Sequence, residues 1–382
     1  MTPQERVYAA FSNQSIDRIP IYCAGMHHRP ASHVLGREAM IGYGYRRWQE
    51  SLALWNGEEA HRELLERSYR DVFELNEILD ADLVFVQYGG YPVRPTFPIN
   101  EHTFFYGDED KHWWVMRYDP DTELFQRVAG SPSPEPTMED LQRQVERMEQ
   151  EAEEYDPTPD DFPWQKRALE HFGDEREVFG HGILVWVPRE RVWLEAMLLD
   201  PDLVLRWTMA LAEKACKNAR LMARMGCRVL FGGGDFAGKN GPLYSPESFA
   251  RCMSPALRKL SACCEEAGVW HMFASDGDLW PVADELFGNC GVHGYHEIDR
   301  RAGMDLETLR DRFPHLRLMG GVASETLHLG TPEDVRGECL SALEVAKRRG
   351  RIMVGVSNTV VAMSPPENVD VMVETLRSKR SH

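Results

Sequence analysis

The sequence has no run of about 18 consecutive apolar residues, the length that a membrane-spanning helix needs. Its first residues, MTPQERVYAAF, lack the basic-then-apolar order of a signal peptide. Long basic runs are absent too, and 43 lysines and arginines stand against 61 aspartates and glutamates, a net charge of -18. Nucleic acid and anionic membranes are therefore poor partners. We expect a cytoplasmic protein whose main partner is a small molecule.

The eight cysteines form no CxxC pair, and most lie within apolar or helical patterns. We expect buried free thiols in a reducing compartment. Internal repeats and low-complexity segments are missing. Three glycines, Gly232 to Gly234, follow an apolar run, but no GxGxxG or GxxxxGK[ST] pattern follows them. The sequence therefore gives only weak support for a phosphate-binding loop.

From residue 178 onward, apolar strand-like runs alternate with amphipathic helical stretches, the pattern of parallel βα units. Two earlier runs bring the number of predicted strands to about eight, which fits a closed (β/α)8 TIM barrel of about 250 residues with insertions. The predicted strands are 18–24, 81–88, 177–187, 227–233, 269–275, 292–298, 316–322 and 351–357. The predicted helices are 190–198, 202–225, 246–267, 279–288, 305–313, 332–348 and 366–378.

The residues beyond a standard barrel lie in the N-terminal half of the chain. A helical pattern in residues 36–80 predicts an extension that covers the barrel floor or one flank. Residues 100–130 alternate in strand fashion around turn residues and predict a β-hairpin insertion. We therefore expect one barrel domain over residues 1–382, with the first strand and the helical extension in residues 1–80.

Polar residues follow several of the predicted strands. Asp276 comes directly after the run VWHMFAS, and Gly277 permits a tight turn there. Asp235, Asp299 and Asn358 end FGGGD, GYHEID and GVSN in the same way. In a parallel barrel the C-terminal strand ends surround one cavity, where catalytic groups gather. We predict Asp276, Asp235 and Asp299 as catalytic residues and Asn358 as a substrate-binding residue.

These assignments have structural alternatives. Asp276 would equally suit the N-cap of the next helix, where a carboxylate is stabilising. His271 lies inside a predicted strand and fits either a hydrogen-bonded core histidine or a site residue, whereas His296 is a candidate for substrate binding. The loop after the first strand adds candidates that would bind a substrate carboxylate, a metal or nothing. These are His27, His28 and Arg29.

Nearly the whole chain resembles the uroporphyrinogen decarboxylase superfamily. RVYAAFSNQSIDRIPI is similar to its N-terminus, and GDFAGKNGPLYSPESF, AGMDLETL, GGVASETLHLGTPEDV and SPPENV are similar to its C-terminal half. The resemblance implies a distorted (β/α)8 barrel, often dimeric, in a superfamily of cofactor-free decarboxylases and of methyltransferases that work with corrinoid proteins. AGMHHRP replaces the family's RQAGR motif, Gln87 stands at the position of its catalytic aspartate, and Asn358 stands at that of its late histidine. These departures argue against uroporphyrinogen as substrate and make Gln87 a substrate-binding candidate.

The methyltransferase branch holds zinc through an HxC strand end and a distant cysteine, and the zinc activates a thiol. Here Ala274 and Asp276 stand at the HxC positions. Because thiolate ligands are absent, a divalent metal, zinc or a harder cation, would need an oxygen-rich site. The resemblance implies Asp276, Asp299 and His271 for that site, with His296 as the alternative histidine.

Within the superfamily, the chain most resembles members that carry an SDGD-like element. This resemblance implies the transfer of a methyl group from a small or aromatic substrate to a corrinoid protein. Asp276 would be the acid that helps the leaving group depart. The alternative is a cofactor-free decarboxylase, in which Asp276 or Asp235 stabilises a protonated intermediate and the His27 to Arg29 loop holds the carboxylate. A barrel that only binds a ligand is the non-enzymatic alternative. The sequence contains no cobalamin-binding module, so we expect cobalamin only on a partner protein.

Overall fold

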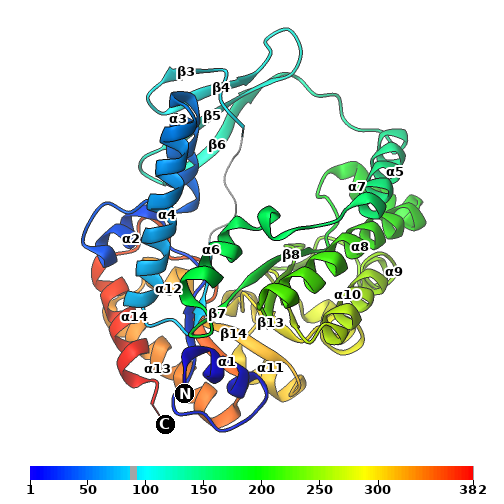
Figure 1. Cartoon of the computed structure of the whole chain (residues 1–382). Helices are drawn as coiled ribbons and strands as arrows, with labels where there is room; N and C mark the ends of the chain where they lie inside the picture. The colour runs from blue at the N-terminus through cyan, green and yellow to red at the C-terminus, as the bar shows by residue number, and fades with distance from the viewer. Residues whose placement is uncertain (87–92, 382) are drawn as a thin grey trace.

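The computed structural model describes residues 1–86 and 93–381. Its centre is a parallel sheet with the strand order β7-β2-β1-β15-β14-β13-β12-β9-β8 (Figure 1). β7 (Glu177–Val178) and β8 (Gly180–Leu184), the two ends of this order, are two parts of one strand that is interrupted at Phe179. β7 pairs with β2, and β8 pairs with β9. The sheet therefore closes on itself as an eight-stranded barrel.

The eight predicted strands are confirmed, with shorter bounds. Besides β7 and β8, they are β1 (Ile21–Cys23), β2 (Leu83–Val84), β9 (Val229–Gly233), β12 (Trp270–Ala274), β13 (Gly294–His296), β14 (Arg317–Val322) and β15 (Ile352–Val356). Alternate side chains such as Tyr22, Phe231 and Met272 pack in the barrel interior. The residues between them face the surrounding helices, as the period of two in a strand requires.

Helices surround the barrel. They are α7 (Arg191–Leu199), α8 (Pro201–Met225), α9 (Pro246–Cys252), α10 (Ser254–Glu266), α11 (Leu306–Arg312), α12 (Ser324–Leu329), α13 (Pro332–Arg349) and α14 (Pro366–Lys379). The predicted helix 246–267 is divided at Met253, because Pro255 can only begin a new helix there. The predicted helix 279–288 is a 3-10 turn (Trp280–Val282) and a π-helix (Asp284–Asn289).

The N-terminal residues close one end of the barrel and flank the other. Val7 and Phe11 of α1 (Pro3–Phe11) pack against interior residues such as Leu83 and Met353, so α1 covers the floor. The helical extension predicted for residues 36–80 consists of α3 (Tyr43–Asn56) and α4 (Glu58–Ile78), and α2 (His28–Leu35), which was not predicted, precedes it. Figure 1 shows α3 and α4 rising along one flank to a separate sheet. Within the described ranges, no helix combines the length and the apolar character needed to cross a bilayer.

The predicted hairpin is a four-stranded antiparallel sheet. Its strands are β3 (Phe97–Asn100), β4 (Thr103–Gly107), β5 (Trp113–Asp119) and β6 (Leu124–Gly130). Trp48 of α3 packs with Phe104 and Tyr118 of this sheet in a second apolar core. The chain returns to the barrel through α5 (Met138–Glu154) and α6 (Pro163–Phe172). We call the unit formed by β3 to β6 the upper lobe.

Candidate active site

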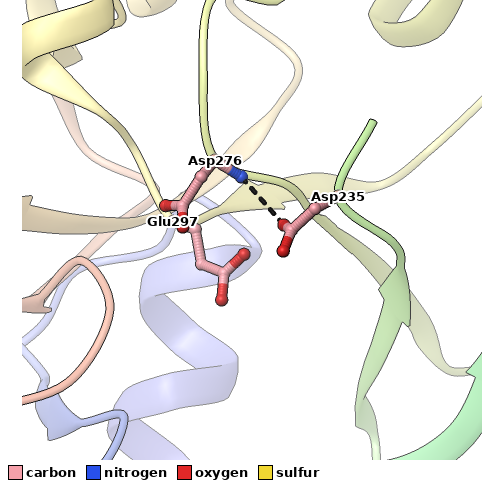
Figure 2. A group of neighbouring side chains, drawn as sticks. All are labelled: Asp235, Asp276 and Glu297. Atoms are coloured by element: carbon pink, nitrogen blue, oxygen red, sulfur yellow. Dashed lines mark hydrogen bonds between the residues drawn. The ribbon is translucent and has the colours of Figure 1, made fainter. Parts of the chain in front are cut away.

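Three carboxylates meet at the C-terminal end of the barrel, called the mouth below. Asp235 lies in the loop after β9, Asp276 in the loop after β12, and Glu297 directly after β13. One oxygen from each side chain lies within 4.8 Å of an oxygen of the other two. Figure 2 shows the three side chains converging from neighbouring strand ends. The expectation that Asp235 and Asp276 share one cavity mouth therefore agrees with this geometry.

Backbone amides and one side-chain amide hold the carboxylates in place. The Asp276 amide donates to Asp235 Oδ1 at 3.2 Å, the dashed line in Figure 2. Asn358 Nδ2 donates to Asp276 Oδ2 at 2.9 Å, so the predicted Asn358 lies at this site. The Gly277 amide donates to Asp299 Oδ2 at 3.3 Å. These bonds tie the loops after β9, β12, β13 and β15 to one another.

Asp299 belongs to the mouth but has a capping role. Its Oδ1 accepts from the Arg301 and Ala302 amides at 3.0 and 3.2 Å, where a short 3-10 helix (Arg300–Ala302) begins. Its Oδ2 accepts from Gly277. Both oxygens are therefore engaged by backbone amides. Asp299 affects Asp276 through its charge. Burial, the charge of Asp235 and the charge of Asp299 together raise the pKa of Asp276.

Glu297 is the site residue that the sequence reasoning missed. Its φ of 69° is in the left-handed region, which costs a residue with a side chain about 1–3 kcal/mol. The conformation turns its carboxyl group toward Asp276, although alternation from the inward-facing His296 would point it to the helices. The Tyr295 hydroxyl lies 3.1 Å from the Ser275 carbonyl oxygen and 3.3 Å from that of Glu297. Tyr295 thus fixes two neighbouring strand ends.

The environment of Asp276 and Glu297 favours their protonated forms. Burial, together with the charges of Asp235 and Asp299, raises the pKa of Asp276 to about 6, and the Asn358 hydrogen bond opposes this shift. Burial, Asp276 and Asp235 raise the pKa of Glu297 well above its ordinary value. Neighbouring carboxyl groups in a poorly solvated site cannot all ionise readily. Asp276 and Glu297 therefore hold a proton more readily than exposed carboxyl groups do.

A cavity of about 690 Å³ opens beside the cluster. Glu297, His296 and Asn358 line it from the barrel, together with Phe85 of the chain after β2. The opposite lining comes from α4 and from the start of α3, including Arg46 and Arg47. A second cavity of about 300 Å³ is lined by Asp276, Asp299 and Asn358. The volume of the first cavity is in the range of pockets for small organic ligands.

The predicted histidines at 271 and 296 face opposite sides of the sheet. His296 is 1% exposed and lies 5.6 Å from the ring centroid of Tyr22 and 5.8 Å from that of Phe231. Neither of its ring nitrogens has a hydrogen-bond partner within the described residues. Burial lowers the pKa of His296 to about 3, so the ring is neutral. Because it also lines the 690 Å³ cavity, it stays a substrate-binding candidate.

His271 is not part of the mouth. Its Nδ1 lies 3.0 Å from the Ser261 hydroxyl of α10, in the layer between barrel and helices. Met272 and Ala274, its neighbours along β12 that point inward, occupy the barrel interior instead. The predicted metal set of His271, Asp276 and Asp299 is therefore not brought together. Side chains alternate between the two faces along a strand, and His271 lies on the face that points to the helices and not into the barrel.

Of the three residues predicted after β1, only His27 contributes to the cavity. His27 lines it, whereas the His28 ring stacks on Tyr45 with centroids 3.5 Å apart and its Nδ1 lies 2.7 Å from the Ala39 carbonyl oxygen. Arg29 donates to the Pro120 carbonyl oxygen of the upper lobe at 2.6 Å. Glu123 of the lobe accepts from the His28 and Arg29 amides. His28 and Arg29 therefore fasten the upper lobe to the mouth, and neither lines the cavity. Gln87 lies outside the described residues.

The side chains that could bind a metal at the mouth differ from the ligands of a zinc site built from thiolates. The eight cysteines are buried, and the mouth group consists of carboxylates alone. Zinc held by thiolates therefore does not fit these residues. Oxygens spaced in this way resemble the donors that Mg²⁺ and Ca²⁺ prefer, but an acidic group alone does not establish a metal site.

Gly277 makes the approach of the loops at the mouth possible. Its φ is 92°, and a Cβ there would lie 2.6 Å from the Ala237 carbonyl carbon. We expect Gly277→Ala to lower the free energy of unfolding by about 1–3 kcal/mol and to displace Asp276. Gly288→Ala is the control, since a Cβ at Gly288 meets no atom within 4 Å. Equal denaturation midpoints for the two variants would contradict this role of Gly277.

The chain is similar to known proteins in its fold and in its match to a family model. A search of curated protein sequences finds no match. A methyltransferase from Methanosarcina mazei shares the fold with a TM-score of 0.64 at 17% identity, covering 99% of both chains. A sugar phosphate isomerase/epimerase from Parabacteroides distasonis reaches a TM-score of only 0.34 at 10% identity, over 56% of this chain and 77% of that one. The model of the uroporphyrinogen decarboxylase (URO-D) family matches residues 189–379, half of the 382 residues. The chain therefore belongs to the uroporphyrinogen decarboxylase family.

Proposed function

We propose that this protein is a methyltransferase that passes a methyl group from a small or aromatic methylated substrate to a corrinoid carried by a partner protein. The observation that carries the proposal is the carboxylate cluster of Asp235, Asp276 and Glu297, in which Glu297 lines the 690 Å³ cavity and Asp276 lines the 300 Å³ cavity. Family membership and the fold shared with the Methanosarcina mazei methyltransferase support it.

The cluster supplies the proton that such a reaction needs. When a methyl group leaves an oxygen, nitrogen or sulfur atom, the bonding electrons stay on that atom, which is a poor leaving group until it is protonated. Asp276 has a pKa of about 6, which suits a general acid working near neutral pH. Glu297 lines the cavity and would hold a second proton next to the leaving atom. The corrinoid would supply the nucleophile that accepts the methyl group.

A cofactor-free decarboxylase is the second candidate. Arg46 and Arg47 line the same cavity and could hold a carboxylate that remains on the substrate. The carboxyl groups of the mouth would protonate the carbon from which CO2 departs. Release of CO2 from a carboxylic acid, without any corrinoid, would favour this candidate over methyl transfer.

The test follows methyl transfer to free cob(I)alamin. The protein is mixed with cob(I)alamin and a panel of methyl ethers, methylamines and methyl thioethers, and the visible spectrum reports the reaction. We expect at least one donor to react at a rate proportional to enzyme concentration. Above pH 6 the rate should fall by about tenfold per pH unit, because the acid form of Asp276 is lost as pH rises through its pKa. A panel without any enzyme-dependent reaction would overturn the proposal.

A further inference from the structure

His296 is a buried histidine whose two ring nitrogens have no hydrogen-bond partner within the described residues. It is 1% exposed and lines the 690 Å³ cavity, directly before Glu297 in the chain. The hydroxyl of the neighbouring Tyr22 ring donates to the Val356 carbonyl oxygen at 3.1 Å, so it is engaged elsewhere. A buried polar group without a hydrogen bond lowers stability. In a cavity wall, such a group suits a partner that a ligand brings.

Aromatic rings hold the His296 ring in place but do not replace its hydrogen bonds. The ring centroids of Tyr22, Phe85, Phe179 and Phe231 lie 5.6, 6.3, 6.0 and 5.8 Å from that of His296. Contacts between N–H groups and aromatic faces are weak compared with a conventional hydrogen bond. Rings packed in this way limit the movement of the imidazole, so its nitrogens keep fixed positions.

The His296 ring is uncharged, which limits the groups that it can bind. Burial, together with the neighbouring His181, lowers the pKa of His296 to about 3. A neutral imidazole offers one N–H donor and one nitrogen acceptor. An ammonium group has no lone pair for that N–H, and a carboxylate would place a further acid beside Glu297. A hydroxyl or ether oxygen avoids both difficulties.

A second uncharged group in the cavity wall lacks a partner as well. Asn76 of α4 is 4% exposed, and its Nδ2 donates to the Val72 carbonyl oxygen at 2.8 Å. Its Oδ1 has no hydrogen-bond partner within the described residues. Apolar side chains such as Ile41 and Leu75 line the same cavity. The lining therefore suits a ligand with an apolar body and uncharged polar groups.

The two arginines of the lining are engaged by other residues. Arg46 Nη1 lies 3.5 Å from Glu50 Oε2, and Arg47 Nη1 donates to the Tyr43 hydroxyl at 2.6 Å. We therefore assign the polar contacts of the ligand to the barrel side of the cavity and not to these arginines.

We propose that His296 is a specificity-determining residue that forms a hydrogen bond with a hydroxyl or ether oxygen of an uncharged ligand, whose apolar body fills the 690 Å³ cavity. Glu297, the next residue, lines the same cavity and would lie close to that oxygen. This inference deepens the proposed function, on which it rests for the identity of the reacting group. Among methyl donors it favours oxygen compounds over methylammonium ions and over thioethers, whose sulfur is a weak acceptor.

The first test measures the binding of matched ring compounds by NMR titration, without any methyl acceptor. The probes are phenol, methoxybenzene and 2-methoxyphenol, and each is paired with the hydrocarbon in which methyl or ethyl groups replace the oxygen substituents. The ratio of dissociation constants within a pair is compared between protein variants, because this comparison separates the hydrogen bond from the apolar contacts. We expect His296→Leu to weaken the oxygen compounds about fivefold, the loss of one neutral hydrogen bond, and to leave the hydrocarbons within about twofold.

Two further variants assign this effect to the ring nitrogens. His296→Gln keeps one donor and one acceptor, so its ratio should lie between those of the unmodified protein and His296→Leu. His33→Leu is the matched control, since His33 is 38% exposed and pairs with Asp370 on the surface. Without ligand, His296→Leu should unfold at the same temperature as the unmodified protein or at a higher one, because apolar atoms replace nitrogens without partners. A lower unfolding temperature with an unchanged ratio would show a structural role alone and would overturn the inference.

The second test observes the ring nitrogens directly and needs no variant of uncertain stability. In the unmodified protein labelled with nitrogen-15 in its histidines, a bound oxygen compound should shift the nitrogen signals of His296. The signals of His271 should stay in place, because its ring lies beside Ser261 of α10. Unshifted His296 signals with a bound oxygen compound, or no binding by any oxygen compound of the panel, would contradict the assignment.

The two proposals fail in different ways. If the oxygen compounds bind as expected but no donor transfers a methyl group to cob(I)alamin, only the proposed function is overturned. If methylamines or methyl thioethers react and methyl ethers do not, only the inference about His296 is overturned.

Discussion

Replacing Asp276 by Asn is expected to slow methyl transfer by about 10²–10⁴-fold while leaving the fold and ligand binding intact. The Asn side chain is nearly the same shape, and its oxygen can still accept the 2.9 Å hydrogen bond from Asn358. It cannot release a proton to the leaving atom. The loss should therefore appear in kcat, and the decline in rate above pH 6 should disappear. Steady-state kinetics from pH 5 to pH 8 measure both effects.

Asp278→Asn is the matched control for this variant. Asp278 lies two residues further along the same loop, and its Oδ1 accepts from the Trp280 amide at 2.9 Å. It is not part of the carboxylate cluster. We expect its kcat to stay within about threefold of the unmodified protein, as for most surface substitutions outside a site. An Asp276→Asn variant with the kcat and pH profile of the control would remove the role assigned to Asp276.

Asp82 should be the acidic residue whose loss destabilises the barrel most. It is fully buried at the floor, forms an ion pair with Arg6, accepts from Arg380 Nη1 at 2.6 Å, and accepts from the Ile21 amide at 2.8 Å. Arg6 and Arg380 are themselves buried. Asp82→Ala would leave two buried guanidinium groups and one amide without this carboxylate. We expect the free energy of unfolding to fall by about 3–5 kcal/mol.

Asp311→Ala is the control, because it removes an exposed ion pair in place of the buried one. Asp311 pairs with Arg349 on the surface, where it is 67% exposed. Exposed pairs contribute about 0–1 kcal/mol because water and salt screen them. Denaturant unfolding of the two variants gives the comparison. If Asp82→Ala shifted the midpoint no more than Asp311→Ala, the buried network at the floor would not stabilise the barrel as we describe.

The barrel could be predicted because its strands are buried on both faces and appear as continuous apolar runs between helices. β3 could not, since its four residues are exposed and include Pro98, so neither apolar content nor alternation marks it. The division of the helix at Met253 depends on Pro255, which the apolar periodicity of residues 246–267 does not reflect. In each case the missed feature depends on a local backbone signal and not on hydrophobic patterning.

The site could be predicted only in part. Asp235 and Asp276 follow apolar runs, so the rule that strand ends meet at the mouth was enough to pair them. Glu297 was missed because its positive φ reverses the direction that alternation predicts. Arg46 and Arg47 lie in the helical extension, and no pattern in the sequence indicates which helix leans over the mouth. His271 was misplaced because a strand pattern does not fix which face of the sheet a single histidine occupies.

The ionisation of Asp276 tests the central claim most directly. Infrared difference spectra between pH 4 and pH 8 resolve protonated carboxyl groups by their C=O stretch, and the Asp276→Asn variant identifies the band that belongs to Asp276. We expect a band that disappears with a midpoint at about pH 6 and that is missing in the variant. A midpoint near pH 4, the ordinary value for aspartate, would contradict the proposal that Asp276 supplies the proton for the reaction.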